Sequence, residues 1–226
     1  MKKTYNIAID GPAGAGKSTI ARLAAGQLGF IYVDTGAMYR AMALYFLRRG
    51  ANLADEEAVG AACRDIHVEI RYEAGEQQVL LNGENVTGQI RTDQVGNAAS
   101  AISKYPAVRA ALLELQRSLA RTNSVIMDGR DIGTLVLPDA DLKIYLTAST
   151  AVRAMRRYKE FLEKGVDCTL ESVEQDVIRR DEQDMNRATA PLKQAEDAVY
   201  LDASDMNISQ VVEKILSLAR ERGLEA

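Results

Sequence analysis

Short apolar runs that end in a turn or an acidic residue recur along the chain of 226 residues. Each run has the length and composition of a strand that is buried on both faces of a parallel sheet. Helical patterns lie between the runs. The expected strands are residues 5–10, 30–34, 124–128, 142–147 and 198–202, and the expected helices are residues 17–28, 37–49, 148–164 and 208–222. The pattern predicts an α/β fold in which a five-stranded parallel sheet is flanked by helices, with ligands at the carboxyl ends of the strands.

Two stretches interrupt this alternation. Residues 62–86 read as short antiparallel strands, with turns at Ala74-Gly75 and Asn82-Gly83. A helix at about residues 106–121 leads back to the sheet, and residues 169–191 form a charged helix followed by a loop that a proline closes. We therefore expect a single domain. Its core covers about residues 1–61, 122–152 and 192–226, and it carries an insert at about 62–121 and a second region at about 153–191.

Charge and hydropathy limit the classes of partner. Lys and Arg number 28 against 32 Asp and Glu, so the formal net charge is −4, and the surface as a whole does not attract nucleic acid. No apolar run approaches the roughly 18 residues that cross a membrane, and the amino terminus reaches a loop too soon for a signal peptide. We expect a cytoplasmic monomer that binds small molecules, with a local anion site and no nucleic-acid or membrane partner.

Histidine and cysteine are scarce. The chain has one histidine, His67, which we expect as a half-buried strand residue. A single histidine argues against metal sites built from several histidines and against serine–histidine catalytic triads. Cys63 and Cys168 form no Cys-x-x-Cys motif and are expected as reduced thiols. The chemistry must therefore rest on other side chains.

The stretch DGPAGAGKST contains the pattern G-x-x-x-x-G-K-[ST]. It follows an apolar strand and opens a helix, which is the context in which this motif binds a nucleotide phosphate. The backbone N–H groups of the turn attract anions, Lys17 can reach the β- and γ-phosphates, and Ser18 offers a hydroxyl to Mg²⁺. A glycine-rich turn with a chance lysine is the alternative. The predicted phosphate loop consists of Gly11, Pro12, Ala13, Gly14, Ala15, Gly16, Lys17, Ser18 and Thr19.

Two other strand ends carry candidates for a second phosphate site. In DTGAMYR, Asp34 and Thr35 can cap the following helix, and Arg40 lies either on a solvated face or beside a phosphate. In MDGRDIGT, Asp128 stands where an acid would hold Mg²⁺ or its water shell. Arg130 and Asp131 follow it, and they form either a local ion pair or part of the site.

A third group of charges lies in the region at residues 153–191. Arg180, Asp184 and Arg187 have the spacing i, i+4 and i+7, which is one stripe of a helix. A salt-bridged surface helix explains that spacing equally well. Arg153 and Arg157 share a helix face in the same way. Arginines near the ligand end of the sheet suit a lid that gathers phosphates and excludes water.

Six segments together resemble the bacterial cytidylate kinases, in order and over nearly the whole chain. They are GPAGAGKST, DTGAMYR, IRTDQVGNAAS, YPAVRAALLELQR, MDGRDIGT and RRDEQDMNRATAPL. The resemblance implies a P-loop kinase fold with a monophosphate-binding insert at residues 62–121 and a short helical lid. It also implies transfer of the ATP γ-phosphate to CMP or dCMP, with Mg²⁺ as the cofactor.

The resemblance assigns roles to residues at matching motif positions. Gly11–Thr19 become the ATP phosphate loop, to which we add Arg153 and Arg157, and Ser18 and Asp128 are expected as metal ligands. Lys17, Arg130, Arg180 and Arg187 are expected in catalysis. The CMP site is expected to contain Thr35, Arg40, Ser100, Arg109, Arg130, Asp131, Arg180, Asp184 and Arg187.

The chemistry of the base agrees with these assignments. Cytosine offers an amino donor beside two acceptors, so it needs an acceptor such as Asp131 and donors such as Arg109 and Ser100. Uracil would turn a carbonyl toward the carboxylate, a mismatch that a buried polar site rejects. Two alternatives stay open. One is a P-loop kinase for UMP or for a small molecule such as shikimate, and the other is a regulator that holds ATP without transferring its phosphate.

Overall fold

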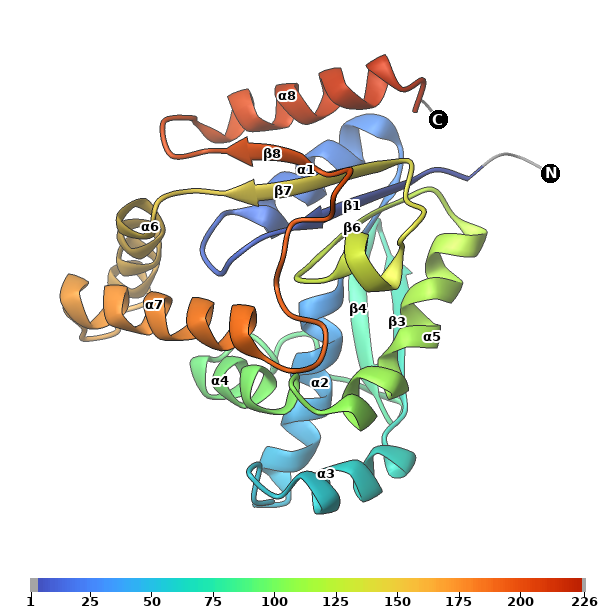
Figure 1. Ribbon diagram of the computed structural model, residues 1–226. Coiled ribbons are helices and arrows are strands. Elements are labelled where there is room, and N and C mark those ends of the chain that lie inside the picture. Colours follow the sequence, from blue (N-terminus) through green and yellow to red (C-terminus); the bar gives the residue numbers. More distant parts are fainter. Residues whose placement is uncertain (1–3, 225–226) are drawn as a thin grey trace.

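A sheet of five parallel strands forms the centre of the molecule, which Figure 1 shows as a computed structural model that describes residues 4–224. The strand order is β2-β6-β1-β7-β8. The strands are β1 (Asn6–Asp10), β2 (Ile31–Asp34), β6 (Val125–Gly129), β7 (Leu142–Thr147) and β8 (Val199–Asp202). All five expected strands are confirmed, and no end differs by more than one residue.

Successive residues of β1 and β6 enter two separate cores, because their side chains alternate between the faces of the sheet. In β1, Ile7 and Ile9 pack with helices α1 and α8, whereas Ala8 packs with α2 and α5 on the opposite face. Figure 1 shows α8 along one face, with α2 and α5 across the other. These helices are α1 (Lys17–Leu28), α2 (Thr35–Arg48), α5 (Pro106–Thr122) and α8 (Ile208–Glu221). Burial on both faces gives the loops at the strand ends a rigid base.

The expected helices are present, with ends within two residues of the prediction, and they include α6 (Thr150–Glu163) and α7 (Leu170–Asn186). Four further helical segments were not predicted. Of these, α4 begins after Thr92, whose side chain caps the helix by accepting from the N–H of Val95. Its buried residues Val95, Ala98, Ala99 and Ile102 do have helical spacing, so the sequence held a signal that the prediction overlooked. The four are α3 (Glu56–Ala62), η1 (Cys63–Asp65), α4 (Asp93–Ile102) and the π-type turn η2 (Ile132–Val136).

The predicted antiparallel insert is confirmed as a sheet of three strands in the order β3-β4-β5. Both predicted turns are present. Ala74-Gly75 and Asn82-Gly83 have positive φ angles at all four residues, as tight hairpins of the primed turn types require. The strands are β3 (Val68–Glu73), β4 (Glu76–Leu81) and β5 (Glu84–Asn85).

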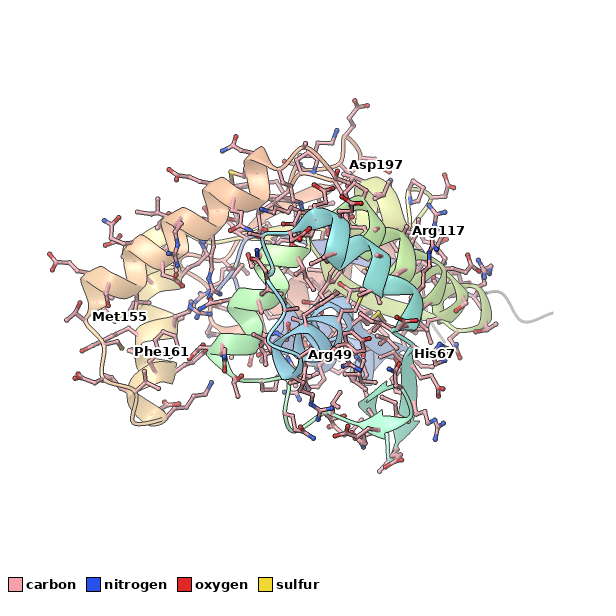
Figure 2. The ribbon with its side chains drawn as sticks, turned by 90° about the horizontal axis from the view of Figure 1, so that it is seen from below. Arg49, His67, Arg117, Met155, Phe161 and Asp197 are labelled. Carbon is pink, nitrogen blue, oxygen red and sulfur yellow. The ribbon has the colours of Figure 1, made fainter. Side chains whose placement is uncertain are left out.

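The prediction for His67 is wrong. β3 begins one residue later, at Val68, which is buried. Because side chains alternate along an extended chain, the imidazole then points outward, and 73% of it is exposed beside Glu69. Figure 2 shows His67 across the molecule from Met155 and Phe161 of α6.

Helices α6 and α7 pack against each other beyond the carboxyl ends of β7 and β8 (Figure 1). The side chain of Ser149 caps α6, and Thr169 with Ser172 forms a capping box at the start of α7. Within residues 4–224, no helix has the length and hydropathy to cross a membrane. The division into core, insert and lid stays a prediction.

Candidate active site

The loop between β1 and α1 contains positions whose backbone conformation suits glycine alone. Gly11 has a φ of 151°, and a Cβ there would lie 1.9 Å from the carbonyl oxygen of Leu146. Gly16, with a φ of 87°, enters α1 in the left-handed conformation and forms no side-chain cap. Gly11 thereby lets the chain pass close to β7. The first N–H groups of α1 are left for another acceptor, such as an anion.

Lys17 lies against this loop, and its environment disfavours its charge. Its Nζ donates to the carbonyl oxygen of Pro12 at 2.7 Å. Burial, and then the positive charge of Arg130, lowers the pKa of Lys17 to about 7, although Asp128 acts in the opposite direction. A phosphate in the loop would supply negative charge beside this ammonium and favour its protonated form.

Two predicted metal ligands lie side by side next to the loop. The Ser18 hydroxyl donates to one carboxylate oxygen of Asp128 at 3.0 Å, and the Tyr32 hydroxyl donates to the other at 2.9 Å. Burial, and then the charge of Asp34, raises the pKa of Asp128 to about 6. A hydroxyl and a buried carboxylate are oxygen ligands of the kind that Mg²⁺ prefers. The pair therefore fits this cation.

Arg153 contacts the phosphate loop from α6. Its Nη1 donates to the carbonyl oxygen of Ala13 at 3.0 Å, and its Nε donates to that of Ala148 at 2.9 Å. Its Nη2 donates to Asp181 of α7 at 2.6 Å. In a trans peptide the N–H points away from the carbonyl oxygen. Arg153 thereby holds the Ala13 carbonyl oxygen on the side of the loop that faces Arg153. The N–H of Gly14 then points to the opposite side of the loop.

A buried charge cluster surrounds Asp131. Arg109 donates to Asp131 Oδ2 through Nη2, and to the carbonyl oxygen of Ser103 through Nη1 at 3.1 Å. Arg187 Nη2 lies 3.7 Å from Asp131 Oδ1, which is too far for a hydrogen bond. Among the described residues, the Nε of Arg109 and the Nη2 of Arg187 are buried without a hydrogen-bond partner. Such groups need polar partners, so the cluster is built to meet one from a ligand.

The pairing of Arg130 excludes one of the two sequence interpretations of its loop, the local ion pair with Asp131. Its Nε donates to Asp184 of α7 at 2.8 Å, whereas Asp131 pairs with Arg109. Arg130 and Asp131 therefore do not form the local ion pair that the alternative required. Thr35, at the start of α2, donates through its hydroxyl to the carbonyl oxygen of Asp128 at 2.7 Å. These contacts connect the end of β6 to both α2 and α7.

The remaining predicted arginines converge from three helices. In α2, Arg40 donates to the carbonyl oxygen of Ile90 at 3.1 Å. In α7, Arg180 donates to Asn97 of α4. Burial first, and then the charges of other arginines, lowers the pKa of Arg40 and of Arg180. In α6, Arg157 lies 3.9 Å from a carboxylate oxygen of Asp93. An anion placed among these groups would relieve the crowding of positive charge.

One cavity of about 980 Å³ joins the phosphate loop to the arginines. Four predicted residues are not among those that line the cavity. They are Gly11, Pro12 and Ala15 of the loop itself, and Arg153, which contacts the loop from outside the cavity. The predicted residues that line the cavity are Ala13, Gly14, Gly16, Lys17, Ser18, Thr19, Thr35, Arg40, Ser100, Arg109, Asp128, Arg130, Asp131, Arg157, Arg180, Asp184 and Arg187. A cavity of this size has room for two nucleotide-sized ligands.

Sequence reasoning missed several lining residues. Arg91 and Arg156 line the cavity, as do Met206 and Asn207 at the start of α8. Arg91 lies inside the quoted segment IRTDQVGNAAS, so that segment was a signal for it. The residues near α8 fall in a short connection with no motif, and only the parallel pairing of β7 with β8 brings them beside the phosphate loop.

A phosphate loop on a parallel sheet of this strand order, with a second cationic cluster in the same cavity, defines a P-loop kinase. Solved structures of other proteins share this fold. A sugar kinase from Janibacter sp. HTCC2649 has a similar fold, with a TM-score of 0.50 and 16% identity over 99% of each chain. An uncharacterized protein from Eubacterium ventriosum has a TM-score of 0.54 and 10% identity over 96% of this chain and 99% of its own. These likenesses concern the fold alone.

The family follows from sequence similarity. The family model described as cytidylate kinase matches residues 7–221. The cytidylate kinase of Desulfitobacterium hafniense is 49% identical over 98% of this chain and 95% of its own. That of Streptococcus pneumoniae is 48% identical over 97% of this chain and 99% of its own. The chain belongs to the cytidylate kinase family of nucleoside monophosphate kinases.

Proposed function

We propose that the protein transfers the γ-phosphate of ATP to CMP or dCMP and forms ADP with CDP or dCDP. Family membership supports the reaction class. The observation that supports CMP or dCMP as the acceptor is the charge cluster at Asp131. This cluster shares a cavity with Lys17 of the phosphate loop. Such a cavity lets one molecule give up a phosphoryl group while a second receives it.

Asp131, Arg109 and Ser100 recognise the cytosine base in this proposal. Asp131 Oδ1 has no hydrogen-bond donor within reach in the described chain, and it can accept from the exocyclic amino group. The unpaired Nε of Arg109 and the hydroxyl of Ser100 can donate to the acceptor edge of the base. A uracil carbonyl would face the carboxylate instead, and CMP would be preferred over UMP.

The monophosphate lies beside Arg40 and Arg130, and Thr35 orients it. Arg180, Asp184 and Arg187 contact the ribose and the phosphates from the α7 side. Guanidinium groups suit this task because their forked donors match phosphate oxygens. The lowered pKa values of Arg40, Arg180 and Arg187 support it, since each arginine already lies in a crowded cationic environment that an anion would neutralise.

The ATP phosphates lie in the loop Gly11–Thr19, near Lys17 and Arg157. Arg153 contributes to ATP binding by holding the Ala13 carbonyl. Ser18 and Asp128 would hold Mg²⁺, which, when bound, neutralises phosphate charge and orients the transferred group. Lys17 and the arginines stabilise the charge that develops during transfer.

Catalysis in this site needs no general base. The attacking atom is a phosphate oxygen of CMP, which is already ionised near neutral pH. The protein therefore acts by positioning the two nucleotides and by excluding water. The exposed position of the single histidine, His67, is compatible with that mechanism.

A panel of nucleoside monophosphates tests the proposal. We expect ATP with Mg²⁺ to phosphorylate CMP and dCMP with kcat/KM at least about tenfold above the value for UMP, AMP or GMP. A preference for UMP would support the alternative of a UMP kinase. ATP binding without transfer to any acceptor, shikimate included, would support the alternative of a regulator.

A further inference from the structure

The outermost strand β2 pairs with β6 on one side only. An edge strand presents backbone N–H and C=O groups that need partners. In β2 these partners come from side chains of the insert. Tyr72 of β3 donates through its hydroxyl to the carbonyl oxygen of Tyr32 at 3.0 Å. The edge of the core sheet is thus joined to a different sheet by side chains and not by a strand.

Gln77 of β4 completes this junction two residues further along β2. Its Oε1 accepts from the N–H of Asp34 at 2.8 Å, and its Nε2 donates to the carbonyl oxygen of Asp34 at 3.2 Å. One carboxamide therefore makes both hydrogen bonds that a neighbouring strand residue would make. Tyr72 and Gln77 lie directly opposite each other in the hairpin. We call this pair, together with its contacts on β2, the hairpin clasp.

The clasp holds β2 where the core meets the monophosphate half of the site. Asp34 is the last residue of β2, and its side chain caps α2 by accepting from the N–H of Ala37 at 2.9 Å. Thr35 follows it directly. Arg91 of the insert donates to the Asp34 carboxylate at 2.7 Å. Contacts with Asp34 therefore hold the insert in its position relative to Thr35.

We propose that Tyr72 and Gln77 are positioning residues that hold the insert in the orientation that binds CMP. This inference rests on the function proposed above. The two side chains do not line the cavity, so they act through the backbone of β2. If the clasp opens, the insert samples orientations in which the CMP residues do not converge. The apparent Kd then rises by the inverse of the competent fraction.

The choice of side chains makes the inference specific. Gln77→Glu would keep an acceptor for the Asp34 N–H but lose the donor to the Asp34 carbonyl oxygen, which would then face a carboxylate oxygen. Tyr72→Phe would remove one hydrogen bond and keep the ring. Gln78 provides a matched control, because its carboxamide accepts from Asn85 and its contact stays inside the insert.

The test compares Gln77→Ala, Tyr72→Phe and the control Gln78→Ala with the wild-type protein. Calorimetry gives the Kd values for CMP and for ATP, and NMR hydrogen exchange gives the protection of the Asp34 amide. We expect Gln77→Ala to raise the Kd for CMP about tenfold, to change that for ATP less than twofold, and to expose the Asp34 amide to exchange. Tyr72→Phe should cause a smaller rise for CMP, and Gln78→Ala should cause none.

Unchanged CMP affinity in both clasp variants, with a wild-type protein that binds CMP, would overturn the positioning role. An equal loss for CMP and ATP would also overturn it, because it would indicate general destabilisation. If Gln77→Ala fails to fold, Tyr72→Phe decides by the same readouts. A wild-type protein that binds no CMP would instead refute the proposed function itself, so the two failures are distinguishable.

Discussion

Lys17 shows at the scale of one residue how burial prepares a charge for a ligand. The residue is 6% exposed, and its ammonium donates to the carbonyl oxygen of Pro12 in its own loop. Lys17→Ala should leave a folded protein and lower kcat by about two orders of magnitude or more, because a charge directed at the transferred phosphoryl group is lost. Steady-state kinetics with a thermal melt as the control measure this. A folded variant with near-normal kcat would remove Lys17 from the mechanism.

Asp131 carries the prediction for base specificity. In Asp131→Asn the side chain keeps its size but can present an NH₂ group to the base, so a uracil carbonyl would meet a donor. We expect the ratio of kcat/KM for CMP to that for UMP to fall about tenfold, the change that about 1.4 kcal/mol represents.

The same variant distinguishes specificity from structure. Because Asp131 is buried and paired with Arg109, the substitution also weakens an ion pair, and that loss would reduce activity on both substrates. Only the ratio reports on the base. A ratio that stays constant while both activities fall would assign Asp131 a structural role.

At the scale of elements, Arg153 joins α6 and α7 to the back of the phosphate loop. Arg153→Lys keeps the charge, but a compact ammonium cannot reach the separate partners that the guanidinium contacts through Nε, Nη1 and Nη2. We expect ATP affinity to fall about tenfold, while CMP affinity changes little. The control Arg179→Lys alters an exposed arginine that pairs with Asp176 within α7 and should change neither. Equal weakening of both nucleotides would contradict a role confined to the phosphate loop.

The elements also show which parts of the fold the sequence could predict. Apolar runs such as residues 142–147 predicted strands accurately, because a strand buried on both faces has few alternatives. The helix α4 was missed although Val95, Ala98, Ala99 and Ile102 have helical spacing, and its contacts with α2 determine its place. His67 was misplaced by one position, and in a strand one position reverses the exposed face.

At the scale of the whole molecule, the site depends on contacts between distant segments. Motifs predicted many of the charged residues that line the cavity, but not Asp34, Arg91, Arg156, Lys159, Glu160 or Glu163. They could not predict the partners, such as Arg130 with Asp184 or Arg109 with Asp131, because opposite charges in sequence neighbours are equally consistent with local pairs. Nor could any pattern show that Arg153 is directed at a carbonyl oxygen and away from the cavity.

The crowding of arginines has a consequence for the choice of laboratory buffer. The molecule is acidic overall. Yet Arg40 of α2 and Arg180 of α7 are cations whose pKa values are lowered by burial. Sulfate or inorganic phosphate should therefore occupy the monophosphate position, raise the melting temperature of the ligand-free protein and compete with CMP. Sodium chloride at equal ionic strength serves as the control, and equal effects of the two salts would mean that general screening is responsible. Affinities for CMP measured in phosphate buffer would then be underestimated.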